Sequence, residues 1–409
     1  MSDALPLPPR PNIEQYKNLA RDFQRACKAG DPAAIRSCAL RWMERLAALG
    51  AMSIHADERA AVEHAANHME RRWQKLHPPD RRAQCLLADS QFFVARAHGF
   101  ASWPRFVEHL ELLGRPDSVV SQYEAAVDAI VGGDIATLER LLRANRDLVR
   151  ARSTREHGST LLHYVSANGV EDFRQKTPRN IVEITRLLLD AGADVNATSD
   201  AYGGGSTTLG LVGTSIHPEE AGVQIPLMEL LLTHGARIDQ QGAAGNGHPV
   251  VKGCLANGQG AAARFLAGLG VPLDLEEAAG VGRLDLVKSY FTARGALTNG
   301  ATVEQLKSGF LYACGYGRTE VAEFLLEKGI DPNVATPQGQ TALHWVAYGP
   351  HVEVGRLLLK HRADVNARDE MGRTPLQWAE RTLQSATDPE DVRRARELAQ
   401  LLREAGASS

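Results

Sequence analysis

Two histidines at helical spacing are the first residues of this chain whose type and position could do chemistry. His64 and His68 are four residues apart, so a helix would present both imidazoles on one face, as in many metal sites. Ala65, Ala66 and Asn67 lie between them, so the H-E-x-x-H pattern of metalloproteases is absent. No third ligand follows from the spacing. A solvated, charge-rich helix explains the pair better, and we expect neither a metal nor a cofactor.

A basic cluster around Trp73 is the second candidate, because cations beside an aromatic ring can contact nucleic acid. Its members are Arg71, Arg72, Lys75, Arg81 and Arg82. Residues 1–114 nevertheless carry 16 Lys and Arg against 13 Asp and Glu, and the whole chain has a formal net charge of −3. This near-balance favours a solvated helix end, so a nucleic-acid adaptor is kept only as an alternative.

Sequence motifs of catalysis are missing from the chain. It has neither a G-x-x-x-x-G-K-[ST] phosphate loop nor a G-x-S-x-G nucleophile elbow. Gly280-Val281-Gly282 does not fit the turn between a strand and a helix that dinucleotide binding requires. We therefore predict a protein that is not an enzyme.

The cysteines and the apolar runs bear on the cellular setting. The five cysteines form no C-x-x-C pair, so neither a zinc site nor a disulfide framework is indicated. The proline-rich start MSDALPLPPRPN lacks the features of a secretory signal, and no apolar run approaches 18 residues. These observations predict a protein without a membrane span in a reducing, cytoplasmic setting.

Internal repetition reveals the architecture. Residues 183–197 read EITRLLLDAGADVNA, and residues 353–367 read EVGRLLLKHRADVNA. Weaker copies lie at residues 228–239, 263–274 and 322–333. Segments recurring this closely are the units of a repeat protein, in which stacked neighbours bury a continuous core.

Short motifs precede the best copies, namely Thr160-Leu-Leu-His163, Thr341-Ala-Leu-His344 and Thr374-Pro-Leu-Gln377. Together with the GADVN endings they resemble the ankyrin repeat, whose period is about 33 residues. The resemblance implies an all-α solenoid of about eight helix pairs with β-turn fingers over residues 121–409. It also implies that His163 and His344 link neighbouring fingers by hydrogen bonds.

We expect the segment before the repeats, residues 1–114, to form a small helical domain. Apolar residues at three- and four-residue steps and helix-start residues indicate five helices. Their expected ranges are 13–29, 32–49, 56–76, 82–98 and 103–113. The sequence resembles a helical module found ahead of ankyrin repeats in bacterial proteins, which implies a bacterial source. We expect this domain to act as a terminal cap for the solenoid.

Insertions and one deletion interrupt the repeat period. Extra residues fall at 170–180 and 214–226, and we expect these two turns to lie side by side. A ligand-binding or catalytic pocket between them is an alternative function. From Gly270 to Gly282 the spacing is too short for a finger, so the fifth unit should be a bare helix pair.

The resemblance implies an interaction scaffold or adaptor that binds another protein through its concave surface, and we expect it to be a monomer. Contacts in the family come from finger tips and from the exposed ends of inner helices. Carried over by position, the candidates are Glu156, His157, Ser159, Ala167, Asn168, Asp200, Tyr202, Pro337, Gln338, Gln340, Tyr348, Glu370, Met371, Arg373 and Arg381. Tyr202 and Tyr348 are the strongest, since tyrosines often anchor interfaces.

Overall fold

Helices make up nearly all the regular structure of this protein. The computed structural model describes residues 4–49, 58–76, 84–238 and 249–408. In these ranges the only strands are β1 (Thr198–Ser199) and β2 (Ser206–Thr207), which pair antiparallel. The predicted all-α class is therefore confirmed. The chain divides into two compact units, Met1–Pro249 and Val250–Ser409, so the expected boundary between residues 114 and 121 lies inside the first unit and stays a prediction.

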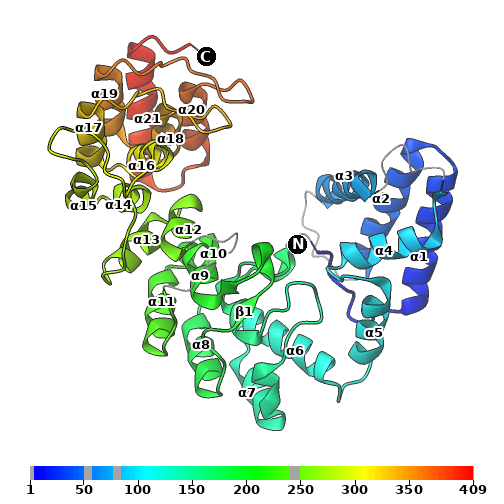
Figure 1. The fold of residues 1–409 in the computed structure, drawn as a ribbon. Helices are drawn as coiled ribbons and strands as arrows, with labels where there is room; N and C mark the ends of the chain where they lie inside the picture. Colours follow the sequence, from blue (N-terminus) through cyan, green and yellow to red (C-terminus); the bar gives the residue numbers. More distant parts are fainter. Residues whose placement is uncertain (1–3, 50–57, 77–83, 239–248, 409) are drawn as a thin grey trace. The chain divides into compact units, whose positions relative to one another are not determined.

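The first unit opens with the five helices that the sequence predicted (Figure 1). They are α1 (Ile13–Lys28), α2 (Pro32–Ala48), α3 (Glu58–Leu76), α4 (Leu87–Ala97) and α5 (Trp103–Leu113). Polar residues begin them as expected: the Asn12 side chain accepts a hydrogen bond from the Glu14 amide, and Asp31 accepts one from the Ala33 amide. The core is aromatic: the ring of Phe23 stacks on Trp73 at 5.4 Å and meets Phe93 edge to face at 5.0 Å.

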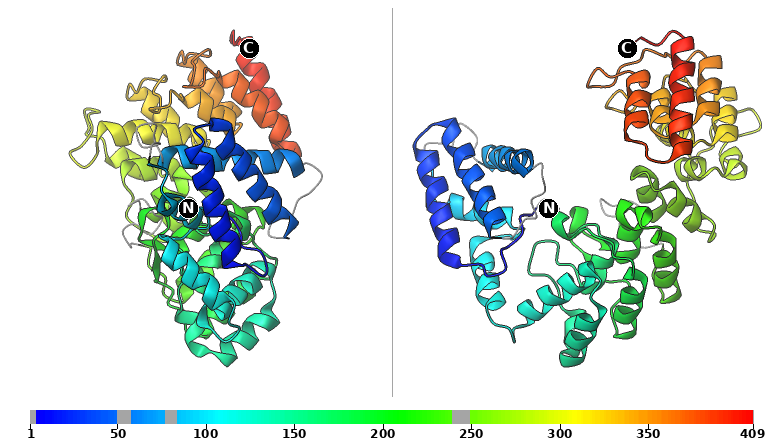
Figure 2. Two further views of the ribbon diagram at one scale, coloured as in Figure 1. Left: turned by 90° about the vertical axis from the view of Figure 1, so that its right-hand side faces the viewer. Right: turned by 180° about the vertical axis from the view of Figure 1, so that it is seen from behind.

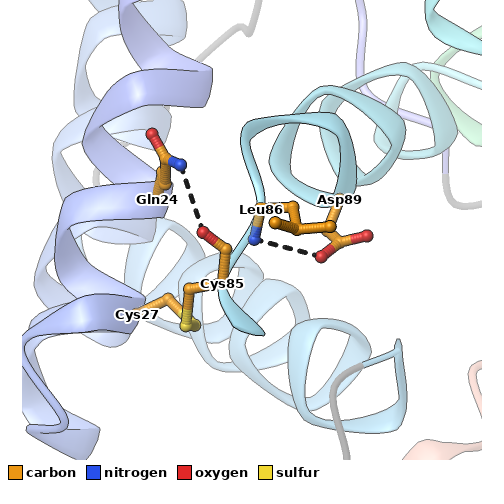
Figure 3. The surroundings of a disulfide bond; sticks show 5 residues. All are labelled: Gln24, Cys27, Cys85, Leu86 and Asp89. Atoms are coloured by element: carbon orange, nitrogen blue, oxygen red, sulfur yellow. Dashed lines mark hydrogen bonds between the residues drawn. A yellow bond between two sulfur atoms is a disulfide. The ribbon is translucent and has the colours of Figure 1, made fainter. Parts of the chain in front are cut away.

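A disulfide bond joins Cys27 in α1 to Cys85 just before α4 (Figure 3). The Cα atoms are 5.8 Å apart, although 58 residues separate the two cysteines in the chain. Gln24 also donates a hydrogen bond to the Cys85 carbonyl, at 3.1 Å. The expectation that the cysteines indicate no disulfide is wrong, because the packing of α1 on α4 brings together residues that no short sequence motif connects. Cys38, Cys254 and Cys314 are free and buried.

The remainder of the first unit contains the first helix pairs of the solenoid, which follow one another along the chain in Figure 1. Their α-helices are α6 (Val119–Gly132), α7 (Ile135–Ala144), α8 (Ile181–Asp190), α9 (Thr208–Gly213), α10 (Ile216–Glu220) and α11 (Gln224–Thr233). Short 3-10 helices are η2 (Arg146–Arg150), η3 (Leu161–Ser166), η4 (Asp172–Arg174) and η5 (Ala201–Gly203). Thus the inner helix of the second repeat is a single 3-10 segment, because Ala167 turns into the left-handed region at φ 48°.

The second unit contains further helix pairs, and its last helices lie side by side in Figure 2. Its helices are α12 (Val250–Ala256), α13 (Gly260–Ala267), α14 (Leu275–Val281), α15 (Leu284–Ser289), α16 (Val303–Gly315), α17 (Thr319–Glu327), α18 (Ala342–Tyr348), α19 (Val352–Lys360), α20 (Pro375–Ser385) and α21 (Pro389–Glu404). Only residues 268–274 join α13 to α14, and Asp274 caps α14 directly. The predicted loss of a finger at this point is confirmed.

The repeat histidines perform the structural task that the resemblance implies. His163 Nδ1 accepts a hydrogen bond from the Thr160 amide at 3.1 Å, so Nε2 carries the proton and faces the Ser206 carbonyl at 3.3 Å. His344 repeats the arrangement: its Nδ1 accepts a hydrogen bond from the Thr341 amide at 3.1 Å, and its Nε2 faces the Arg373 carbonyl at 3.0 Å. Each ring therefore links its own helix start to the next finger.

We predict that loss of the disulfide destabilises the N-terminal helices. Closing a loop of this length stabilises a fold by about 4 kcal/mol, mainly through the entropy of the unfolded chain. Cys27→Ser should therefore lower the free energy of unfolding, measured by urea denaturation, by up to about that amount. Reductant should have the same effect on the wild type and none on the variant. Titration of five free thiols in the unreduced protein would contradict the pairing.

Stability should also fall as the pH drops below about 6.5, the ordinary pKa of histidine. Burial lowers the pKa of His98 to about 3 and the pKa values of His109 and His163 to about 4. The unfolded chain consequently binds more protons than the folded chain between pH 6.5 and 4. The free energy of unfolding therefore reaches its full value only above pH 6.5 and falls as the pH is lowered through this range. The urea concentration at the unfolding midpoint should be lower at pH 5 than at pH 7.5. Equal midpoints would contradict the lowered pKa values of these buried histidines.

Candidate functional site

The first predicted finger is covered by the N-terminal helices rather than open to a partner. The Glu156 amide donates a hydrogen bond to the Gly99 carbonyl at 3.0 Å, and the Glu156 carboxylate pairs with Arg96. His157 and Ser159 are buried, and Ser159 is fully so. Their expected exposure is wrong because the turn between α4 and α5 packs onto this finger. Ala167 is buried as well.

Beneath this finger lies a buried ion-pair cluster, which consists of Glu124, Arg155, Glu171 and Arg174. Arg155 pairs with Glu124 at 2.7 Å and with Glu171 at 2.9 Å. Arg174 pairs with Glu124 at 2.7 Å and, at the edge of the cluster, with the exposed carboxylate of Asp128, also at 2.7 Å. The cluster thereby joins α6, the finger and η4.

Opposite charges keep both buried glutamates ionised. Burial on its own would raise the pKa of Glu124, but Arg155 and Arg174 outweigh it and hold the pKa at about 2. Burial also opposes ionisation of Glu171, yet Arg155, His157 and Arg174 keep its pKa well below the ordinary value. Every carboxylate here is matched by an arginine, so the cluster is suited to holding segments together rather than to transferring protons.

The two inserted turns pack back onto preceding segments of the chain. Glu171 and Arg174 come from the first insertion, and Asn180 at its end donates a hydrogen bond to the Gly133 carbonyl at 2.9 Å. In the second insertion, Gln224 donates one hydrogen bond to the carbonyl of Val212 in the preceding helix and one to the carbonyl of Ser215 within the turn itself, both at 3.1 Å. The first insertion is filled by its own buried ions, which removes the reason for expecting a ligand pocket there.

The glycine-rich finger brings two pairs of predicted residues into contact, Tyr202 with Asn168 and Asp200 with His157. The Tyr202 hydroxyl donates a hydrogen bond to Asn168 Oδ1 at 2.6 Å, and Asn168 donates to Thr214 Oγ1 at 3.0 Å. The Asp200 amide donates to the His157 carbonyl at 2.8 Å. Tyr202 adopts the left-handed conformation with φ 49°, which is unusual for a bulky residue and is held by these contacts. Asp200 and Tyr202 are exposed.

The last two fingers of the second unit are ordered by their own hydrogen bonds. The Glu370 amide donates to the Gln338 carbonyl at 2.8 Å, which locks one finger to the next. Buried Asp369 accepts hydrogen bonds from Arg373 Nε at 2.8 Å and from Trp378 Nε1 at 3.1 Å. Burial opposes its ionisation, but the hydrogen bonds from Arg373 and Trp378 bring the Asp369 pKa to about 2.

An aromatic patch stands next to these fingers, and we define it as Tyr348, Met371, Arg373 and Trp378. Tyr348 is 71% exposed and Met371 is 70% exposed. The rings of Tyr348 and Trp378 meet edge to face at 6.5 Å, and the Arg373 guanidinium lies 5.1 Å from the centre of the Trp378 ring. Met371 joins the patch through Asp369, which accepts a hydrogen bond from the Met371 amide at 3.0 Å. The patch thus contains three of the predicted residues together with Trp378.

The other predicted residues of the second unit surround this patch in the sequence. Pro337, Gln338, Glu370 and Arg381 are exposed, and Gln340 is half-buried. Sequence reasoning missed Trp378, although its place one residue after the Thr-Pro-Leu-Gln motif puts it on the same inner helix as Arg381. It missed the ion-pair cluster too, since the four residues come from three separate segments.

The remaining candidate chemistries receive no geometric support. Among the described residues, no three His, Cys, Asp or Glu side chains are grouped to hold a metal ion. Trp73 is buried in the N-terminal core, so it has no free face on which a base could stack. Arg71 and Lys75 are exposed there, whereas Arg81 and Arg82 lie outside the described residues. No described helix is both long and apolar enough to cross a bilayer.

The architecture defines a repeat protein of stacked helix pairs joined by short fingers. Comparison with protein families gives these units their name: a model of three ankyrin repeats matches residues 310–388, and a model of one ankyrin repeat matches residues 157–200. The chain therefore contains ankyrin repeats in both of its compact units. A search of curated proteins finds no match.

Removing one charge from the ion-pair cluster should strongly destabilise the first unit. Glu124→Gln leaves Arg155 and Arg174 buried with too little opposing charge, which costs about 3–5 kcal/mol. Asp128→Asn removes an exposed partner of the same Arg174 and should cost about 1 kcal/mol or less. Urea denaturation of the two variants measures the difference. If both variants lost the same free energy of unfolding, burial of the Glu124 ion pairs would not be the reason for their stabilising effect.

Proposed function

We propose that this chain is a non-enzymatic binding protein whose partner is another protein, held by the aromatic patch of the second unit. Ankyrin repeats generally mediate protein–protein interaction, which supports a protein as the partner. The exposure of Tyr348 and Met371 supports the aromatic patch as the contact surface. Large apolar side chains exposed together are typical of interaction sites.

The composition of the patch matches the residues that dominate binding energy in protein interfaces. Tyrosine, tryptophan and arginine are over-represented among such residues, and the patch holds one of each. The contacts of Arg373 with Asp369 and Trp378 fix its side chain before any partner arrives. A surface ordered in advance loses less conformational entropy on binding, so its contacts contribute more affinity.

Neighbouring residues of the fingers and of α20 extend the proposed contact area. A mainly polar rim of the kind that surrounds an apolar interface core is supplied by Pro337, Gln338, Gln340, Glu370 and Arg381. In the first unit, Asn168, Asp200 and Tyr202 form a separate candidate contact area. Glu156, His157 and Ser159 are left out of the proposal, because the N-terminal helices already occupy their finger.

We infer the cellular setting from the sequence and from the Cys27–Cys85 disulfide. A bacterial source and a monomeric state remain predictions. For location, the Cys27–Cys85 bond argues against the predicted reducing cytoplasm, because structural disulfides are typical of oxidising compartments. We therefore favour an oxidising compartment over the cytoplasm.

The test compares two variants that each remove exposed apolar side chains, one within the patch and one outside it. The double variant Tyr348→Ala and Met371→Ala should capture less of a partner from native lysate. With the purified partner, its binding free energy should be weaker by about 2 kcal/mol or more. Leu269→Ala is the control, since Leu269 is 51% exposed and follows α13, away from the patch. Mass spectrometry of the eluates identifies what each protein retains. Unchanged capture by the folded double variant would exclude the patch.

A further inference from the structure

The first unit exposes two large apolar side chains on neighbouring segments of the chain. Tyr202 in the glycine-rich finger is 42% exposed, and Ile216 at the start of α10 is 51% exposed. Hydrogen bonds connect the two segments. The Tyr202 hydroxyl donates to Asn168 Oδ1 at 2.6 Å, and the Asn168 side-chain amide donates to Thr214 Oγ1 at 3.0 Å. Thr214 is two residues before Ile216, so both apolar side chains belong to one local surface.

Exposed carboxylates accompany these two side chains. Burial raises the pKa of the Tyr202 hydroxyl, and the negative charge of Asp172 raises it further, which places Asp172 close to this ring. Glu219 and Glu220 follow Ile216 by three and four residues, so they share its side of α10. We define the acidic surface as the two apolar side chains together with four exposed acids, namely Asp172, Asp200, Glu219 and Glu220.

Little positive charge offsets these carboxylates. The exposed cations of the first insertion, Lys176 and Arg179, come later, where the insertion turns back toward Gly133. Among the described residues, neither Asp200 nor Glu220 has an ion-pair partner. No lysine or arginine occurs in the three segments that form the acidic surface, residues 168–172, 200–205 and 214–222.

Apolar contact and charge have different roles at such a surface. Burial of Tyr202 and Ile216 against a partner supplies affinity. The carboxylates select a cationic partner and repel nucleic acid and anionic lipid. The hydrogen bond with Asn168 orders the Tyr202 ring in advance, so less conformational entropy is lost on binding.

We propose that the acidic surface binds a lysine- or arginine-rich segment of a partner protein that also carries apolar side chains. The cations of this segment pair with the carboxylates, and its apolar side chains pack on Tyr202 and Ile216. The surface includes the separate contact area of the first unit, so the proposal rests on the proposed role in binding a protein. It does not rest on the aromatic patch. The protein then has two contact surfaces of different chemistry.

Fluorescence anisotropy of a labelled peptide with the full chain tests this proposal. The probe is a short, flexible peptide of lysine, leucine and glycine. We expect saturable binding that weakens as sodium chloride is added, because salt screens exposed charges. A peptide with glutamate in place of each lysine should bind at least about tenfold more weakly, and so should one with glycine in place of each leucine.

Charge reversal within the acidic surface should weaken binding of the lysine peptide. The double variant Asp200→Lys and Glu220→Lys should lose about tenfold in affinity or more. Glu183→Lys with Asp190→Lys is the matched control, since both residues are exposed on α8 of the same unit and lie outside the acidic surface. This control should bind the peptide as the wild type does. Equal losses in the two double variants would overturn the assignment of the site.

Tyr202→Asn measures the apolar contribution, because asparagine accepts the left-handed backbone at this position and lacks the ring. Its affinity for the peptide should fall by about tenfold, and circular dichroism checks that it is folded. The double variant Tyr348→Ala and Met371→Ala should bind the peptide unchanged, so failure of the aromatic patch and failure of the acidic surface are distinguishable. The proposal is overturned if binding does not saturate at millimolar protein, or if the glutamate peptide binds as tightly as the lysine peptide.

Discussion

The buried pairing of Arg155 and Arg174 with Glu124 and Glu171 is the interaction on which the first unit depends. One arginine comes from a finger, the other from an insertion, and the two glutamates come from α6 and that same insertion. Removal of any one partner would leave a charge without solvent, so the segments can be buried only together. These ion pairs hold the finger against α6. The Arg155 guanidinium also lies 5.4 Å from the centre of the Phe100 ring. The insertion that was considered as one wall of a ligand pocket is thereby part of the core.

Local patterns predicted the repeats well because they reflect local physics. The apolar spacing, the helix-start residues and the Thr-x-x-His motif all act within one or two helical turns, and the structure places the helices close to the expected positions. The shortened inner helix at Leu161–Ser166 was not foreseen, since it depends on Ala167 adopting φ 48° where the chain enters the insertion. The resemblance to ankyrin repeats added the finger-to-finger role of His344, which spacing alone does not give.

The site was harder to predict, since exposure depends on what else packs nearby. His157 and Met371 both belong to fingers, yet His157 is buried and Met371 is 70% exposed. The difference arises from the helices before Gly99, which cover the first finger, and nothing in the finger sequence records that cover. Likewise, Cys27 and Cys85 meet only because α1 and α4 pack together. Long-range packing therefore decides which of the finger residues are exposed.

The cover over the first repeat also has a consequence for assembly. A stack of similar modules has two unlike ends, and a bare end of one molecule is shaped to receive the opposite end of another. Such head-to-tail contacts do not close, and they generate filaments. Here α5 packs on α6, and His109 contacts Thr154 at 2.7 Å, so the face before the first repeat is already occupied from within the chain. The chain itself therefore fills one of the two faces that a head-to-tail contact between stacks would need.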